Sequence, residues 1–273
     1  MVHRPAWAPD GVEIERPAAA RMYDYYLGGS HNFEADRALA RENMRVWPDV
    51  AHIARANRAF LRRAVGYLGE VGIDQFLDLG SGIPTVGNVH EIAHAANPES
   101  RTVYVDADHV AFAHASSLLA DTPYATIVHA DLRDPAAVLG DPAVTAAFDF
   151  DRPIAVLMFS VLHFVPPADD PAEVVAAYRA ATAPGSYLAV SHATNDYKPE
   201  RAKATEDIYS QASHQMIFRS HGQIAALMAG YELVPPGLVD MIHWRPDPAD
   251  TRPDPLGGDV TRYSGLAALG RRD

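Results

Sequence analysis

Four apolar runs in the middle of the sequence each lead into polar residues that could bind a ligand. The first, Gln75–Leu79, contains Asp78 and continues into Gly80-Ser81-Gly82. The two glycines permit a tight turn and let a ligand approach backbone N–H groups at a helix start. The Asp78 carboxylate would repel a diphosphate and attract an ammonium group, so this turn favours a ligand that carries an amine.

The next two apolar runs are followed by acids. Thr102–Val105 precedes Asp106, and Ala125–His129 is followed two residues later by Asp131. An acid at the end of the second strand of a nucleotide-binding sheet accepts hydrogen bonds from a ribose diol. An acid after the third strand can accept one from an exocyclic amine such as the adenine amino group.

The fourth run, Ile154–Phe159, is apolar throughout, which is typical of a strand buried on both faces. Ser160 follows it directly, and His163 comes three residues later. His163 could act as a general base, although a packed or solvent-facing histidine is the commoner role. Each polar residue alone is more often a cap or turn residue, but four such strand ends in this order indicate one binding site.

Strands that alternate with helices predict a parallel sheet covered by helices on both faces, an α/β fold. We expect helices after the Gly-rich turn and over His109–Leu119 and Glu173–Ala181, with a fifth strand at Ser186–Ser191. In such sheets, ligands bind beyond the C-terminal ends of the strands, where the strand order reverses. The polar residues described above all belong to that edge.

The first 72 residues follow another pattern. Helical spacing of apolar residues predicts three helices, over Ala18–Leu27, Glu34–Arg45 and Val50–Leu68. We therefore expect a helical cap, residues 1–72, packed on a core domain, residues 73–273. Gly28-Gly29 separates the first two helices, and we expect the bend at Gly28–Phe33 to fold over the ligand.

Several cap side chains could contact that ligand. The tyrosines could present aromatic faces to a cation, and the arginine could reach a carboxylate. Core packing, capping and solvation are the alternative roles for these residues. The candidates are two residues of the bend, three tyrosines and one arginine: His31, Asn32, Tyr23, Tyr25, Tyr26 and Arg58.

The motifs DLGSG, VYVDAD, HADLRD and SVLHFVPP, in this order, resemble the class I S-adenosylmethionine-dependent methyltransferases. The segments RPAAARMYDYYLGGSHNFEADR and RANRAFLRRAV resemble more narrowly a bacterial family of methyltransferases known mainly from genome sequences. The likeness extends from about Arg16 to Arg271. Pro84 departs from the pattern, since many relatives have a third glycine there, but that glycine mainly eases helix packing.

The resemblance implies a Rossmann-like sheet of seven mostly parallel strands, with the last strand antiparallel. Tyr231–Val239 fits the sixth strand and Tyr263–Gly270 the seventh. An insertion at Asn195–Arg219 would complete the wall of the substrate pocket together with the cap.

The resemblance also implies S-adenosylmethionine as cofactor. The Gly-rich turn would hold its methionine end, Asp106 its ribose hydroxyls and Asp131 its adenine amino group. The expected cofactor-binding residues of the core are Asp78, Gly80, Ser81, Gly82, Asp106, Ala107, Asp131, Leu132 and Ser160. We expect methyl transfer to a small-molecule acceptor, with His163 or a side chain of the cap as the base if one is used. The alternatives are a cofactor-binding regulatory protein without turnover and, disfavoured by Asp78 and the missing third glycine, an NAD-dependent oxidoreductase.

A second motif, His90-Glu91-Ile92-Ala93-His94, matches the H-E-x-x-H pattern of zinc metalloproteases. It falls on the helix that leaves the Gly-rich turn, and no third ligand is evident. Asn88 with Glu91 also has the spacing of a helix capping box. We therefore expect no metal site here.

The composition restricts the remaining possibilities. The 273 residues carry a net charge of −12 with two lysines, and there are no cysteines. Phosphate backbones reward clustered Lys and Arg, so a nucleic-acid partner is disfavoured. The absence of cysteine excludes disulfides, thiolate metal sites and a cysteine nucleophile. No run reaches the roughly 18 apolar residues of a membrane span, and the N-terminus lacks a signal-peptide core, so we expect a cytoplasmic protein.

Overall fold

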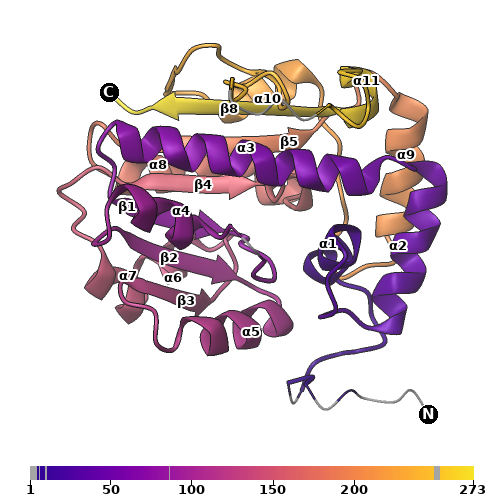
Figure 1. Ribbon diagram of the computed structural model, residues 1–273, viewed down its shortest axis with the longest axis horizontal. Helices are drawn as coiled ribbons and strands as arrows, with labels where there is room; N and C mark the ends of the chain where they lie inside the picture. Colours follow the sequence, from indigo (N-terminus) through magenta and orange to yellow (C-terminus); the bar gives the residue numbers. More distant parts are fainter. Residues whose placement is uncertain (1–4, 6, 10, 86, 249–252) are drawn as a thin grey trace.

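The computed structural model describes residues 5, 7–9, 11–85, 87–248 and 253–273. A twisted sheet forms the centre of the molecule, with helices on both faces and a group of helices at one end (Figure 1). Within the described residues the sheet has eight strands in the order β3-β2-β1-β4-β5-β8-β6, with β7 also paired to β8. This is the predicted α/β class.

The five parallel strands confirm the predicted pattern. Their bounds are β1 Gln75–Leu79, β2 Arg101–Asp106, β3 Ala125–His129, β4 Ala155–Phe159 and β5 Tyr187–Ala193. The chain runs from β1 outward to β3 and then returns to β4 on the other side of β1. Strand order therefore reverses between β1 and β4, which is where such sheets bind their ligands.

The C-terminal strands are antiparallel. β8, Gly265–Arg271, pairs with β5 along seven residues. The predicted single sixth strand is split in two: β6, Glu232–Leu233, and β7, Val239–Asp240, both pair with β8. Pro235-Pro236-Gly237 lies between them, and proline has no N–H to donate to the neighbouring strand.

Alternating strand residues point to opposite faces, and each face has its own hydrophobic cluster. Phe76 and Leu157 point to one face and Leu77 and Met158 to the other. The first face is covered by α3 (Val50–Glu70), α4 (Val89–Ala96) and α5 (His109–Leu119). The second is covered by α6 (Pro135–Leu139), α7 (Pro142–Ala147), α8 (Pro171–Ala181) and α10 (His221–Leu227).

The N-terminal helices have the predicted positions, with bounds that differ by one or two residues. α1 is Ala19–Leu27 and α2 is Glu34–Val46. Gly28 ends α1 in the left-handed region at φ 86°, as helix-ending glycines often do. Figure 1 shows α1, α2 and α9 (Pro199–Tyr209) grouped beyond the C-terminal ends of β1 to β4, whereas α3 runs along the sheet. The three helices share a hydrophobic cluster that includes Met22 and Leu39.

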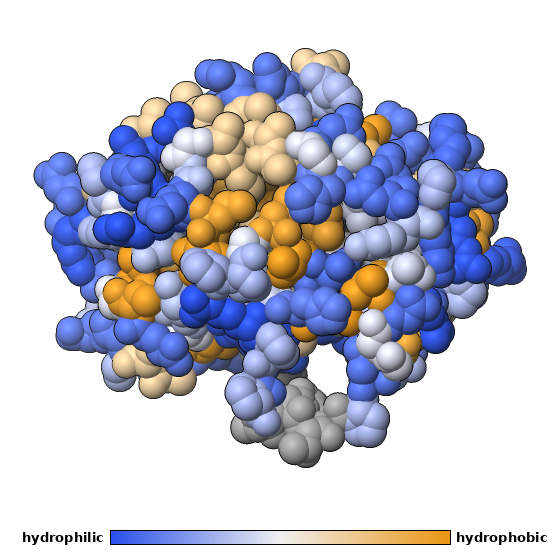
Figure 2. Space-filling model, turned by 90° about the horizontal axis from the view of Figure 1, so that it is seen from above, coloured by the Kyte–Doolittle hydropathy of each residue, from blue (hydrophilic) through white to orange (hydrophobic). Residues whose placement is uncertain are grey.

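The surface on the β8 side is mostly hydrophilic, with hydrophobic residues gathered near the centre of the view and in smaller groups to its left and right (Figure 2). A short helix α11, Val260–Tyr263, precedes β8. Of the helices in the described ranges, none is long and apolar enough to cross a membrane.

Candidate functional site

A cavity of about 380 Å³ lies between the C-terminal ends of the strands and the cap helices. Its volume falls within the roughly 300–1,000 Å³ of small-molecule sites. Thirteen of the sixteen site residues expected from the sequence line it: Tyr23, Tyr26, Arg58, Asp78, Gly80, Ser81, Gly82, Asp106, Ala107, Asp131, Leu132, Ser160 and His163. The other three, Tyr25, His31 and Asn32, do not.

An acid of β1, a serine of the Gly-rich turn and an arginine of α3 line the cavity where β1 ends. Gly80 has φ 71°, and a Cβ there would lie 2.2 Å from Val161 Cγ2, so only glycine fits. Burial raises the pKa of Asp78 to about 7, although the Arg58 guanidinium opposes the shift. Ser81 Oγ and Arg58 Nε are buried and have no hydrogen-bond partner among the described residues. Buried polar atoms usually have partners, so this end of the cavity suits a polar ligand.

Asp106 is held by the backbone on both sides. Its Oδ2 accepts a hydrogen bond from Gly82 N at 2.7 Å, and its Oδ1 accepts one from Asp108 N at 2.8 Å. Burial raises the pKa of Asp106 to about 6, and the two N–H groups limit the rise. Each carboxylate oxygen keeps a second lone pair, so the fixed carboxylate can still accept hydrogen bonds from a diol.

Asp131 follows β3 and is paired with Arg133. The guanidinium contacts both Asp131 oxygens at 2.6–3.0 Å and also reaches Asp169 at 2.8 Å. Burial opposes ionisation of Asp131, but the Arg133 hydrogen bonds hold its pKa below its usual range. Leu132, between them in sequence, is buried and lines the cavity.

Ser160, at the end of β4, begins a network that joins the sheet to the cap. Its backbone, at φ 51°, donates to Ser191 Oγ at 2.9 Å. Ser191 Oγ donates to Asn57 Oδ1 at 2.5 Å, and Asn57 Nδ2 donates to the Tyr23 hydroxyl at 2.9 Å. All four residues line the cavity. Asn57 and Ser191 were not among the sequence candidates, and their only sequence signal is a polar residue on an apolar helix face or strand.

His163 lies after β4 in a short 3-10 turn, Leu162–Phe164. Its Nδ1 is buried and has no hydrogen-bond partner in the described part of the chain. Burial, with help from His192 and Arg219, holds the pKa of His163 well below its usual range. A neutral imidazole at the cavity wall can accept a proton or a hydrogen bond.

His31 and Asn32 are held away from the cavity by Asp24. Its carboxylate accepts hydrogen bonds from the His31 backbone N–H at 2.9 Å and from Asn32 Nδ2 at 2.7 Å. The His31 ring also packs against His114 of α5, with centroids 3.8 Å apart. These contacts hold the bend against α5, so its placement does not support the expectation that its side chains cover the ligand.

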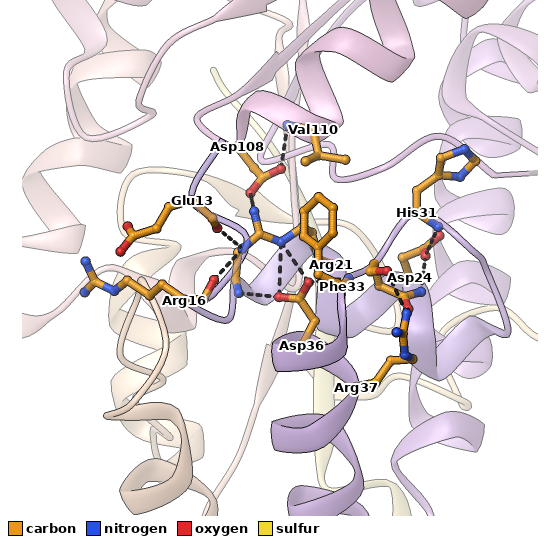
Figure 3. A network of polar contacts seen from close by, with 12 residues as sticks. Glu13, Arg16, Arg21, Asp24, His31, Phe33, Asp36, Arg37, Asp108 and Val110 are labelled. Carbon is orange, nitrogen blue, oxygen red and sulfur yellow. Dashed lines mark hydrogen bonds and ion pairs between the residues drawn. The ribbon is translucent and has the colours of Figure 1, made fainter. Parts of the chain in front are cut away.

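Helix α1, unlike the bend that follows it, contributes side chains to the cavity wall. Tyr23 and Tyr26 line it, whereas Tyr25 does not. Arg21, also on the wall, is 4% exposed and lies between Asp36 of α2 and Asp108 at the start of α5, at 3.0 and 3.2 Å (Figure 3). Arg21 was not among the residues expected from the sequence, because an arginine on a short helix is usually exposed to solvent.

The two histidines of the H-E-x-x-H motif have other partners. His90 Nδ1 is 2.7 Å from the Tyr104 hydroxyl, and His94 Nε2 is 2.9 Å from the Ser100 carbonyl oxygen. The predicted capping box of Asn88–Glu91 is confirmed at the start of α4. Among the described residues, no group of three or more His, Cys, Asp or Glu side chains could hold a metal ion.

Comparisons with known proteins agree with this geometry. The family model described as S-adenosyl methyltransferase matches residues 5–270. A candidate methyltransferase from Thermobifida fusca YX is 40% identical with a TM-score of 0.91, covering 98% of this chain and 100% of its own. A DUF574 family protein from Streptomyces avermitilis MA-4680 is 36% identical with a TM-score of 0.90, covering 95% of this chain and 99% of its own.

A more distant structure shows the fold alone. It is an S-adenosylmethionine-dependent methyltransferase from Mesorhizobium loti, 20% identical with a TM-score of 0.53, covering 77% of this chain and 95% of its own. No curated protein matches the sequence.

Proposed function

Because this chain belongs to the S-adenosyl methyltransferase family, we propose that its cavity binds S-adenosylmethionine along the strand ends and a small-molecule acceptor beneath the cap. The protein is an S-adenosylmethionine-dependent methyltransferase. The observation that carries the placement of the cofactor is the set of buried, unpaired polar atoms around the Gly-rich turn.

Those atoms match the methionine end of the cofactor, which carries one ammonium and one carboxylate group. The buried carboxyl of Asp78 would hold the ammonium, while Arg58 Nε and Ser81 Oγ would donate to the carboxylate. Charge-assisted hydrogen bonds of this kind are the stronger ones in proteins.

The adenosine end would lie along β2 and β3. Asp106 would accept the ribose hydroxyls, since its position is fixed by Gly82 and Asp108. The side chains of Ala107 and Leu132 would line the adenine ring, and Asp131 would accept from its amino group.

When bound, S-adenosylmethionine supplies a methyl group activated by a sulfonium. The chain itself would orient the acceptor and exclude water, because α1, α2 and α9 cover the strand ends. His163 would accept the acceptor's proton. The division into a cap at residues 1–72, a core at 73–273 and an insertion at 195–219 remains our proposal; its support is that Thr205, Tyr209 and Phe218 line the cavity.

We also propose that the protein works in the cytoplasm and has no nucleic-acid partner. The size of the cavity and the net charge of −12 support the absence of a nucleic-acid partner. The absence of cysteine supports the cytoplasm, because the protein needs no oxidising compartment to form disulfides.

Titration calorimetry tests the cofactor assignment. We expect S-adenosylmethionine and its demethylated product, S-adenosylhomocysteine, to bind, with little affinity for NAD. Preference for NAD, or no binding of either adenosyl compound, would contradict the proposal. Release of S-adenosylhomocysteine with a panel of small acceptors would then separate an enzyme from a protein that only binds its cofactor.

A further inference from the structure

One part of the cavity wall has no charged side chain among the described residues. Every described Asp, Glu, Lys or Arg on the wall belongs to residues 13–21, to Arg58 or to the strand ends at 78, 106–108 and 131–133. The wall contributed by residues 43–54, 205–209, 216–218, 241 and 263–265, here called the acceptor half, is uncharged among described residues. Its aromatic side chains are Trp47, Tyr209, Phe218 and Tyr263, and Tyr26 and Phe164 adjoin it.

Polar side chains in the acceptor half already have hydrogen-bond partners: Trp47 Nε1 donates to the Arg262 carbonyl, the Tyr263 hydroxyl donates to Asp254, and others pair with one another. Asn43 Nδ2 donates to the Tyr26 hydroxyl at 3.1 Å, and Thr205 Oγ1 donates to Asn43 Oδ1 at 3.0 Å. The Tyr26 and Tyr209 hydroxyls lie 3.2 Å apart. An ionised group placed here would be buried without a counter-ion, which is strongly unfavourable. Aromatic walls instead favour a flat, uncharged ring.

One imidazole of the cavity wall next to the acceptor half has a buried ring nitrogen without a hydrogen-bond partner among the described residues. The His163 ring packs on Phe164 with centroids 4.5 Å apart, and Phe164 packs on Tyr209. His163 Nδ1 has no partner among the described residues. His192, the neighbouring lining histidine, is engaged at both ring nitrogens, donating to the Ala193 carbonyl and accepting from Arg219. A neutral imidazole beside an apolar pocket suits a ligand with an acidic hydroxyl.

We propose that the acceptor is an uncharged aromatic compound with a hydroxyl group on its ring, and that the product is its methyl ether. This inference rests on the methyltransferase function proposed above. The acceptor oxygen forms a bond to the methyl carbon, the carbon–sulfur bond breaks with its electron pair going to sulfur, and the hydroxyl proton goes to His163. The positive charge thus moves from sulfur to the imidazole and later leaves as a proton to solvent.

The first experiment measures binding to the full chain saturated with S-adenosylhomocysteine. The probes share one ring system: a naphthol, the naphthoate, the naphthylmethylammonium ion and the saturated decalol. We expect calorimetry to show the naphthol binding about tenfold or more tightly than the other three. Equal or tighter binding of either ion, or of the decalol, would overturn the inference. If S-adenosylhomocysteine does not bind, both the proposed function and this inference fail. If S-adenosylhomocysteine binds and the naphthol does not, only this inference fails.

The second experiment tests His163. With S-adenosylmethionine and the naphthol, mass spectrometry should show the aryl methyl ether. His163→Gln should lower its formation by about 10²–10⁴-fold, while binding of S-adenosylhomocysteine and of the naphthol changes less than about threefold. His243→Gln, at an exposed histidine, is the matched control and should keep full activity. Unchanged methylation in His163→Gln, or equal loss in the control, would overturn the role of His163.

Discussion

Asp78 and Asp106 are buried carboxyl groups at the ends of neighbouring strands, and both are costly to ionise without a ligand. Burial raises the pKa of Asp78 to about 7 and that of Asp106 to about 6, against an ordinary value of 3.8. The folded chain therefore keeps protons that the unfolded chain releases above pH 4. The contribution of these two carboxyl groups to stability should therefore fall as pH rises from about 4 to 7, and an ammonium or a diol would offset that cost.

The Asp78 assignment predicts a pH-dependent affinity for the cofactor. The ammonium pairs only with ionised Asp78, so binding of S-adenosylhomocysteine should strengthen as pH rises to about 7 and then level off. Below that pH, we expect a loss of about tenfold per unit. Asp78→Asn should weaken binding at pH 8 by about 1–3 kcal/mol and remove this part of the slope. Asp121→Asn, at an exposed acid, is the calorimetric control; a slope that persists in Asp78→Asn argues against the pairing.

The Asp106 assignment predicts a loss of affinity without loss of fold. Asp106→Ala removes the acceptors of the ribose diol and should weaken S-adenosylhomocysteine binding by about 1–3 kcal/mol. Thermal unfolding monitored by circular dichroism establishes that the variant is folded. An unchanged dissociation constant in a folded Asp106→Ala protein would place the ribose elsewhere.

At the scale of elements, α1, α2 and α5 are joined by one buried ion-pair network. Asp36, fully buried, accepts hydrogen bonds from Arg21 Nε and from the backbone of Ala18 and Phe33. The Arg21 guanidinium also forms an ion pair with Asp108, which lies two residues after Asp106 (Figure 3). The cap is thereby tied to the loop that would hold the ribose.

This network predicts non-additive stability effects. Asp36→Ala and Arg21→Met should each lower the free energy of unfolding by about 3–5 kcal/mol. Arg21→Met leaves the buried Asp36 carboxyl without a counter-ion, and Asp36→Ala leaves the buried Arg21 guanidinium with Asp108 alone. The double variant should lose less than the sum, which urea unfolding of all four proteins measures. Glu34→Ala, which removes two exposed ion pairs on the same helix, should change little. Additive losses would show that the two side chains do not interact.

At the scale of the whole molecule, α3 belongs to the main core even though it precedes the first strand. Phe60, Leu61, Ala64, Val65 and Leu68 are nearly or fully buried in the cluster shared with β1, β4 and β8. α1 and α2, in contrast, pack with α9 over the strand ends. α3 therefore completes the core on one face of the sheet, whereas α1 and α2 cover the strand ends.

A chain that begins at Gly72 should fail to fold. Each lost large apolar side chain costs about 2–5 kcal/mol, and the total stability of a domain is only about 5–15 kcal/mol. Circular dichroism should show no cooperative thermal transition, and S-adenosylhomocysteine should not bind. A truncated chain that melts cooperatively and binds with full affinity would show that the helices are a separate appendage.

The sequence by itself determined the elements and the set of acids at one edge. Strand and helix periods are local, and in a parallel sheet every strand ends at the same edge, so chain order alone places Asp78, Asp106 and Asp131 together. The sixth strand was the exception, since Pro235-Pro236-Gly237 divides a run whose composition otherwise resembles a strand.

Only the tertiary structure decided which side chains of the cap meet the cavity. The rotation of α1 depends on partners distant in sequence, such as Asp108 and His114 of α5, so Tyr23 faces the cavity while His31 and Asn32 turn toward Asp24. The uncharged acceptor half likewise joins residues up to about 220 positions apart, from Asn43 to Tyr263. Such contacts depend on the packing of whole helices, and no local pattern in the chain encodes them.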